Sequence, residues 1–410
     1  MLADGHAVHD RSVQSREYSR YPTGRRGIRK DFILTTEPED VTYTVAIVGT
    51  GTEPDDPGRD GYAMAYHHAA GYEKLDDCEL VACADIVREN AEAFADEFGL
   101  SDDAVFEEYG AMLSAVEPDI VSVCVPPAVH ADITVDCIES GVVQAVHCEK
   151  PMADTYGDAR AMAEAADRHG VQLTINHQRR FSDAVRTAKQ LLDDGEIGDL
   201  ERVEFAAPVG LFDYGSHSFD LCNYFADESP AKWVLAQIDY SEENVLFGTH
   251  NENQAVVHWE YDSGVHGVGT SDSDFGGGGG PTAAVACHNR LVGSDGVIEV
   301  GAHDEGEELP PLRIRRDGEG WETVETDDGL HGWEFIDRAL AENVRCLREG
   351  DEPELGSDNA LRATELIFAA WESSRRRGRV DLPLDIDDNP LQSMLDSGDL
   401  SPAPTSSGDD

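Results

Sequence analysis

The sequence predicts an α/β protein with two domains. The first is a doubly wound parallel sheet, and the second is an α+β domain with a large, mostly antiparallel open sheet. In the first half, short runs rich in Val, Ile and Ala alternate with helix-like segments. Apolar strands that alternate with helices are typical of a parallel sheet covered on both faces. After about residue 180, strand-like runs follow one another directly, which indicates antiparallel pairing.

Five runs in the first half are expected to be strands, and four segments between them are expected to be helices. The strands are residues 43–48, 79–84, 119–125, 142–148 and 171–176. The helices are residues 61–72, 88–98, 128–139 and 156–169. This alternation predicts one domain over residues 44–176.

A second domain is expected over residues 177–357, and a helix with a return segment is expected over 358–384. The strands are expected at residues 200–206, 232–240, 244–248, 254–261, 265–270, 283–291, 296–300 and 312–315. The helices are expected at residues 182–194, 334–348 and 359–376.

Both ends of the chain differ from the rest in composition. Residues 1–43 are interpreted as an N-terminal extension without structure, because its Arg-rich beginning has few apolar residues and no periodicity. Residues 385–410 hold seven Asp and neither Lys nor Arg, so this segment is interpreted as an acidic, solvated tail.

The charge balance excludes two classes of partner. Lys and Arg total 31 against 83 Asp and Glu, a net charge of −52. Nucleic acid binding needs a basic stripe, and an anionic membrane surface would repel this chain. Residues 120–129 are the longest uncharged apolar run, about half the ~18 residues that span a bilayer. The excess of acid and of Arg over Lys favours halophilic adaptation, although GC-rich codon usage also produces Arg.

The cysteines indicate a reducing compartment. None belongs to a C-x-x-C pair, so a zinc ribbon or a thioredoxin-like site is not expected. The N-terminus shows no charged, apolar and cleavable export pattern, and we therefore expect a cytoplasmic protein. The eight cysteines are Cys78, Cys83, Cys124, Cys137, Cys148, Cys222, Cys287 and Cys346.

A glycine turn follows the first strand and favours dinucleotide binding. Gly49-Thr50-Gly51 would allow the backbone to approach a pyrophosphate closely. Asp85 directly follows the second expected strand, where a carboxylate can accept hydrogen bonds from a ribose and repel a 2′-phosphate. This favours NAD over NADP. The alternative for Asp85 is a helix N-cap.

Three residues could carry acid–base chemistry. Lys150 comes at the carboxyl end of an expected strand, where side chains face the ligand crevice. Asp213 and His217 are four residues apart and would share one helix face. The alternatives are a surface lysine, and an N-cap Asp beside a hydrogen-bonded core His. No metal site is expected, because no third soft ligand has suitable spacing.

These motifs occur together in one known family. The chain resembles the glucose–fructose oxidoreductase and inositol dehydrogenase (Gfo/Idh/MocA) family over about residues 44–384. The matching pieces, in order, are Gly49-Thr50-Gly51, Asp85, Pro126-Pro127-Ala128-Val129-His130, Glu149-Lys150-Pro151, Asn176-His177-Gln178-Arg179-Arg180-Phe181, Gly195-Glu196-Ile197-Gly198, Asp213 with His217, and Val380-Asp381-Leu382-Pro383-Leu384.

The resemblance implies a nicotinamide-binding Rossmann domain, and a C-terminal domain whose open sheet joins copies into a dimer or tetramer. It implies catalysis by Lys150 and His217, assisted by Asp213. Arg180 could instead be a structural cation, and His130 a core histidine. The candidate cofactor contacts are Gly49, Thr50, Gly51, Asp85, Pro126, His130, Glu149 and Lys150. The candidate substrate contacts are Gln178, Arg179 and Tyr214.

The expected function is that of an NAD-dependent sugar or polyol dehydrogenase. In this hypothesis His217 removes the hydroxyl proton, and Lys150 stabilises the developing alkoxide. Two alternatives are an NAD-dependent glycoside hydrolase of the same fold and a non-catalytic NAD-binding regulator. The presence of Lys150, Asp213 and His217 together argues against the regulator, because a sensor needs no acid–base pair.

Overall fold

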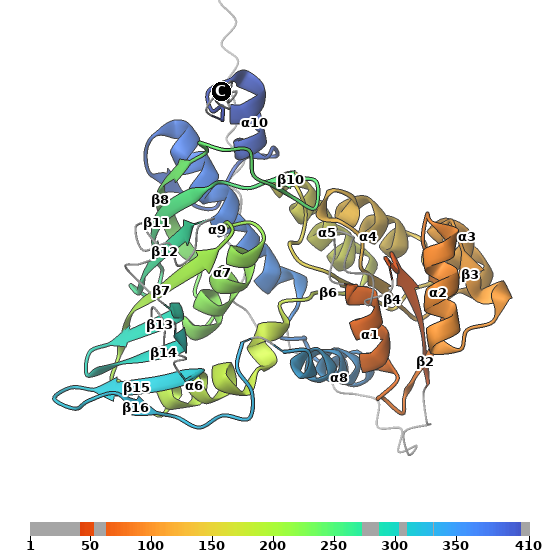
Figure 1. Ribbon diagram of the computed structural model, residues 1–410, viewed down its shortest axis with the longest axis horizontal. Helices are drawn as coiled ribbons and strands as arrows, with labels where there is room; N and C mark the ends of the chain where they lie inside the picture. Colours follow the sequence, from red (N-terminus) through yellow and green to blue (C-terminus); the bar gives the residue numbers. More distant parts are fainter. Residues whose placement is uncertain (1–41, 53–62, 273–286, 303–309, 331, 403–410) are drawn as a thin grey trace, which may run out of the picture. The chain divides into compact units, whose positions relative to one another are not determined.

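The computed structural model describes residues 42–52, 63–272, 287–302, 310–330 and 332–402, and residues 42–410 cluster as one compact unit. Its first sheet has six parallel strands in the order β3-β2-β1-β4-β5-β6 (Figure 1). This order reverses direction between β1 and β4, where open α/β sheets bind ligands. The strands are β1 (Tyr43–Val48), β2 (Cys78–Ala84), β3 (Val105–Phe106), β4 (Ile120–Val123), β5 (Ala145–Cys148) and β6 (Gln172–Ile175).

Helices cover both faces of this sheet because its strands are apolar on both sides. In β1, Val45 and Ile47 belong to one hydrophobic cluster, while Ala46 and Val48 belong to another. The predicted alternation of strands and helices is therefore confirmed. The helices of this part are α1 (Met64–Tyr72), α2 (Arg88–Phe98), α3 (Tyr109–Val116), α4 (His130–Glu139) and α5 (Tyr156–His169). The short β3 and the helix α3 were not predicted.

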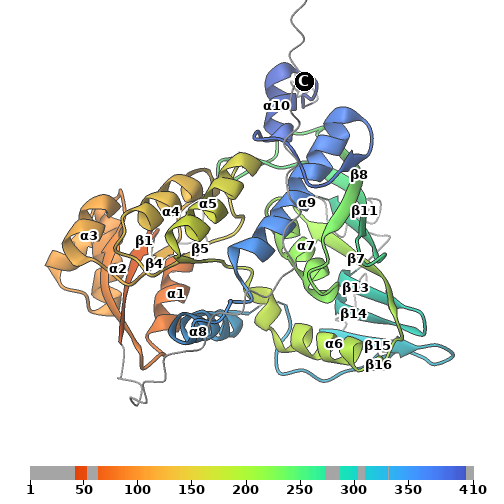
Figure 2. The same cartoon turned by 180° about the vertical axis from the view of Figure 1, so that it is seen from behind.

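Helix α8 (Glu334–Glu349) completes one face of the first sheet. Its buried Ile336, Leu340 and Val344 pack in the same cluster as Val45 and Ile47, and α8 lies beside α1 in Figure 1 and in Figure 2. The sequence placed residues 334–348 in the second domain. The helix packs with both parts, because its Phe335 and Ala339 also cluster with Phe181 and Leu355, which belong to the second domain as predicted from the sequence. The domain boundary stays a prediction.

The second sheet has nine strands in the order β16-β15-β14-β13-β7-β12-β11-β8-β17. All neighbours are antiparallel except β12 and β7, so the predicted mostly antiparallel sheet is confirmed. The strands are β7 (Leu200–Pro208), β8 (Ala231–Asp239), β11 (Gln254–Tyr261), β12 (His266–Asp272), β13 (Cys287–Gly293), β14 (Gly296–Ala302), β15 (Leu312–Arg316), β16 (Glu322–Thr323) and β17 (Val380–Asp381).

The strand expected at residues 244–248 does not join this sheet. It forms part of a separate pair, β9 (Val245–Leu246) with β10 (Thr249–His250). Parts of the expected elements at 61–72 and 283–291 lie outside the described residues. The helices that belong with the second sheet are α6 (Asp183–Asp193), α7 (Tyr214–Phe225) and α9 (Ser357–Arg376).

The interpretation of residues 385–410 as a solvated tail is wrong for its first part. Helix α10 (Pro390–Ser397) forms there and packs on α9. Asn389 caps it by accepting a hydrogen bond from the backbone N–H of Gln392. Leu391 and Met394, three positions apart, lie on its buried side. Residues 403–410 lie outside the described part of the chain.

Candidate functional site

The glycine turn lies at the carboxyl ends of β1 and β4. Gly49 and Gly51 have φ values of +84° and +64°, which favour glycine. A Cβ on Gly49 would lie 2.5 Å from Val125 Cγ1, so no larger residue fits there without a shift. This close approach of backbone at the point where the strand order reverses fits a bound dinucleotide phosphate.

Asp85 holds this turn in place. Its Oδ2 accepts hydrogen bonds from the Gly51 backbone N–H at 2.9 Å and from the Thr50 hydroxyl at 3.2 Å. Its Oδ1 accepts from the Val87 backbone N–H at 2.8 Å, just before α2 begins. Asp85 is not itself the N-cap, because Val87 occupies that position. A carboxylate has about four acceptor positions, so capacity remains for a ribose hydroxyl.

His130 and Pro126 follow β4. The buried His130 ring places Nδ1 2.8 Å from the carbonyl oxygen of Pro151 and Nε2 2.8 Å from that of Val125. Burial lowers the pKa of His130, and the two carbonyls partly oppose that shift. The ring therefore ties the segment after β4 to the segment after β5. This geometry favours the core-histidine alternative over a polar cofactor contact.

Glu149 lies in a buried polar network that the sequence did not predict. Its Oε1 accepts hydrogen bonds from Asn176 Nδ2 at 2.6 Å and from His68 Nε2 at 2.9 Å. Burial raises its pKa, but His68 and Asn176 outweigh that effect and hold the pKa at about 2. His68 Nδ1 also lies 2.7 Å from the Ser122 hydroxyl. Glu149 thus joins α1, β4, β5 and β6 rather than facing a ligand freely.

Lys150 and Asp213 meet although they are 63 positions apart. Lys150 follows β5, and its Nζ donates a hydrogen bond to Asp213 Oδ1 at 2.8 Å. The two side chains are 19% and 17% exposed, so they are accessible but mostly shielded from water. Asp213 occupies the N-cap position of α7, as the alternative had it, but its side chain makes no capping hydrogen bond. Its carboxylate accepts the hydrogen bond from Lys150 instead.

His217 lies one turn into α7 and is 3% exposed. Burial lowers its pKa well below the usual 6.5, and the charges of Arg179 and Lys150 lower it further. The ring of His177 lies edge-on to it, with 5.7 Å between centroids. Among the described residues, His217 Nδ1 has no hydrogen-bond partner. His217 is therefore neutral near pH 7, and this nitrogen is not engaged by the protein.

The candidate substrate contacts come from the short helix η3 (Gln178–Phe181) and from the start of α7. The Arg179 guanidinium lies over the Tyr214 ring, 4.2 Å from its centroid. One of its nitrogens also contacts Nε2 of His288 on β13. Gln178 is buried, and its Oε1 has no partner within the described part of the chain. Two of the three candidate substrate contacts, Arg179 and Tyr214, therefore touch each other.

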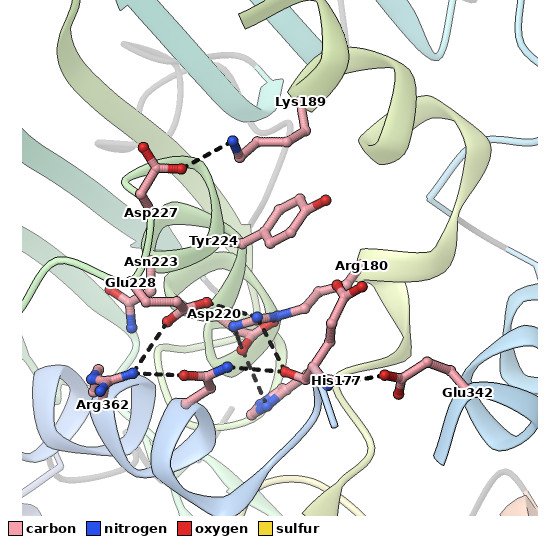
Figure 3. A network of polar contacts seen from close by, with 12 residues as sticks. His177, Arg180, Lys189, Asp220, Asn223, Tyr224, Asp227, Glu228, Glu342 and Arg362 are labelled. Atoms are coloured by element: carbon pink, nitrogen blue, oxygen red, sulfur yellow. Dashed lines mark hydrogen bonds and ion pairs between the residues drawn. The ribbon is translucent and has the colours of Figure 1, made fainter. Parts of the chain in front are cut away.

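The contacts of Arg180 favour the alternative that it is a structural cation. It binds both oxygens of Asp220, at 2.7 and 2.6 Å, and pairs with Glu228 at 2.7 Å. Burial alone would lower its pKa, but the two carboxylates outweigh burial and raise it. Figure 3 shows Arg180 and Asp220 together with His177, whose Nδ1 lies 3.6 Å from Asp220 Oδ1.

Sequence reasoning missed the roles of His177, His288 and His68. His177 stands inside the motif at 176–181, which was the available signal. His288 and His68 contact partners that lie 109 and 81 positions away, and no local sequence pattern predicts such contacts.

Among the residues that the structure describes, no group of three or more His, Cys, Asp or Glu could hold a metal ion. In the same residues, no helix is long and apolar enough to cross a membrane.

The sequence resembles both a protein-family model and individual dehydrogenases. A family model described as an oxidoreductase family with an NAD-binding Rossmann fold matches residues 44–177. The D-glucoside 3-dehydrogenase of Escherichia coli K12 is 34% identical over 253 residues, which cover 52% of this chain and 68% of that protein. The D-apiose dehydrogenase of Paraburkholderia graminis is 25% identical over 352 residues, 77% of this chain and 86% of that one.

The solved structures agree on the fold. An aldose-aldose oxidoreductase from Caulobacter crescentus, complexed with glycerol, superposes with a TM-score of 0.66 and 21% sequence identity. The match covers 83% of this chain and all of the other, 100%. The shared region therefore includes both sheets and not only the first one.

Proposed function

Because the chain belongs to the Gfo/Idh/MocA family of oxidoreductases with an NAD-binding Rossmann fold, we propose that it is an NAD-dependent dehydrogenase. Its substrate is a sugar, a polyol or a sugar derivative, and it oxidises a secondary alcohol of that substrate. The observation that carries this proposal is the Lys150–Asp213 hydrogen bond at 2.8 Å, next to a His217 whose pKa is lowered by burial and then by the charges of Arg179 and Lys150.

Each of the three residues has a part in the proposed reaction. His217 is neutral and accepts the proton of the substrate hydroxyl. Lys150 donates a hydrogen bond to the same oxygen as negative charge develops on it. Asp213 positions the Lys150 ammonium through their hydrogen bond. When bound, the nicotinamide supplies the hydride acceptor. The Gly49 turn and Asp85, which holds it, would bind the dinucleotide.

NAD is the proposed cofactor rather than NADP. The Asp85 carboxylate lies beside the glycine turn, where a 2′-phosphate would place a second negative charge. A screen should follow reduced-cofactor absorbance with NAD and NADP against polyols, aldoses, sugar acids and glycosides. We expect at least one substrate to reduce NAD, with kcat/KM at least about tenfold higher than with NADP, a difference of about 1.4 kcal/mol.

Two results of this screen would contradict the proposal. Binding of NAD without any turnover across the panel would favour a regulator. Release of sugar from a glycoside without accumulation of NADH would favour the glycoside hydrolase. A preference for NADP would leave the dehydrogenase intact and remove the role of Asp85 in cofactor selection.

The pH dependence should report the state of His217. The base must be neutral, and burial together with the charges of Arg179 and Lys150 holds its pKa well below 6.5. Activity is therefore kept as the pH falls through 6.5 and is lost only below it. We expect the acid limb of kcat/KM to lie below pH 6.5 when it is measured from about pH 4.5 to 8 at constant ionic strength. A limb above pH 6.5, in enzyme that survives preincubation, would exclude His217 as this base.

A further inference from the structure

Two neighbouring arginines are buried in very different electrostatic surroundings. Arg179 and Arg180 are 8% and 1% exposed, and among the described residues they are the only buried Lys or Arg side chains. Arg180 is paired with two carboxylates, Asp220 and Glu228. Arg179 contacts the His288 imidazole and the Tyr214 ring, and no carboxylate of the described chain lies within ion-pair distance of it. One buried cation is thus neutralised, and the other has no counter-charge among the residues that the structure describes.

A shortage of acidic residues does not explain this difference, because the chain has 83 Asp and Glu. Burying a cation without a counter-charge costs several kcal/mol, and proteins ordinarily avoid it. Burial lowers the pKa of the Arg179 guanidinium, and the nearby Tyr214 and Asp213 only partly oppose this shift. A buried guanidinium without a carboxylate partner is suited to bind an anion from outside the protein.

The carboxylates near the site are already engaged with other groups. Asp213 pairs with Lys150, and the ionised Glu149 accepts hydrogen bonds from His68 and Asn176. Among the described residues, Arg179 is therefore a site cation with no ion-pair partner, in a chain whose net charge is −52. After burial, the charge of Arg179 is the next cause of the lowered pKa of His217, so the two groups lie close together. The buried His217 Nδ1 has no partner among the described residues, and it can donate to an anion beside Arg179 while Nε2 accepts the hydroxyl proton.

We propose that the substrate is anionic and that Arg179 binds its negatively charged group while Lys150 and His217 act on a hydroxyl. This inference rests on the proposed dehydrogenase function and narrows its substrate class to sugar acids or sugar phosphates. The planar fork of Arg179 matches a carboxylate or a phosphate. The aromatic stacking on Tyr214 fixes the orientation of that fork.

The test compares substrates that differ in charge. D-Glucuronate and D-galacturonate are each set against the parent sugar and the uncharged methyl ester, and glucose 6-phosphate tests the phosphate. Binding to the full chain with NAD present is measured by calorimetry, and turnover by NADH absorbance. We expect at least one anion to bind about 10- to 100-fold more tightly than its uncharged counterparts, as a charge-assisted hydrogen bond does. Whether carboxylate or phosphate is preferred identifies the class.

Variants then assign the preference to Arg179. In Arg179→Gln we expect the ratio of anionic to neutral affinity to fall to within about threefold of unity, and Arg179→Lys should retain part of it. Arg186→Gln is the matched control, because Arg186 on α6 pairs with Glu354 and its side chain is about one-third exposed. Its ratio should be unchanged. Equal binding of charged and neutral ligands by the unaltered protein would overturn the inference. Turnover of neutral sugars alongside that result would leave the proposed dehydrogenase standing.

Discussion

Lys150→Ala and His217→Ala should each lower kcat by at least about 100-fold, the lower end of the contribution of a positioned acid–base group. Lys150 is the ammonium that meets Asp213, and without it the developing alkoxide loses its hydrogen-bond donor. Without His217 the hydroxyl proton has no neutral imidazole to accept it. Turnover is measured at saturating NAD, and the folded state is checked by thermal melting.

The matched controls are Lys74→Ala and His169→Ala, which remove the same groups from exposed positions. Both should retain turnover within about twofold, because surface ion pairs contribute little. If either site variant kept turnover as high as its control while folding normally, that residue would leave the mechanism. The other residue would then need a different partner in proton transfer.

Arg180→Met should lower the free energy of unfolding by about 3–5 kcal/mol, the cost of breaking a buried ion pair. The change leaves the buried carboxylate of Asp220 without its cation, while Glu228 keeps only Arg362, 3.8 Å away. Figure 3 shows Arg180 beside Asp220 and Arg362 beside Glu228. Denaturant unfolding at one fixed salt concentration measures the loss.

Arg345→Met on α8 is the control for this substitution. Arg345 pairs with Glu349 and Asp351 at 2.8 Å and with Glu342 at 3.7 Å, but its side chain is 41% exposed. Its loss of stability should be much smaller than that of Arg180→Met, because water screens exposed ion pairs. Equal losses for the two variants would show that burial of the Arg180 cluster does not determine its contribution. Arg180→Met should cost less free energy of unfolding in the Asp220→Asn background than in the unaltered protein, because the two changes partly compensate. A larger cost in that background would also count against the pairing.

Much of the fold was predictable because strand and helix periodicities are local properties of the sequence. The parallel first sheet and the mostly antiparallel second sheet were found in this way. Helix α8 was located correctly along the chain, but its packing on the first sheet was not foreseen, since an apolar stripe does not reveal which surface covers it. Helix α10 was missed because seven Asp in residues 385–410 outweighed the spacing of Leu391 and Met394.

The site was predictable only where a motif carried it. Lys150 and Asp213 were singled out by motif, and the structure brings them into contact. Glu149 was expected to contact the cofactor, but its partners His68 and Asn176 hold it in a buried network that depends on folded geometry. The salt requirement, the compartment and the oligomeric state stay predictions.

Helix α8 has a consequence for how the chain is made. The first sheet ends with β6 at Ile175, whereas the helix that seals one of its faces ends at Glu349, a difference of 349 − 175 = 174 residues. At ~5–20 residues per second, a ribosome needs roughly 10–35 s to synthesise that stretch. During this time α1 and α2 already cover part of this face, and the part that Ile336, Leu340 and Val344 of α8 will cover stays exposed. A fragment truncated after β6 would therefore expose an apolar surface that the full chain buries.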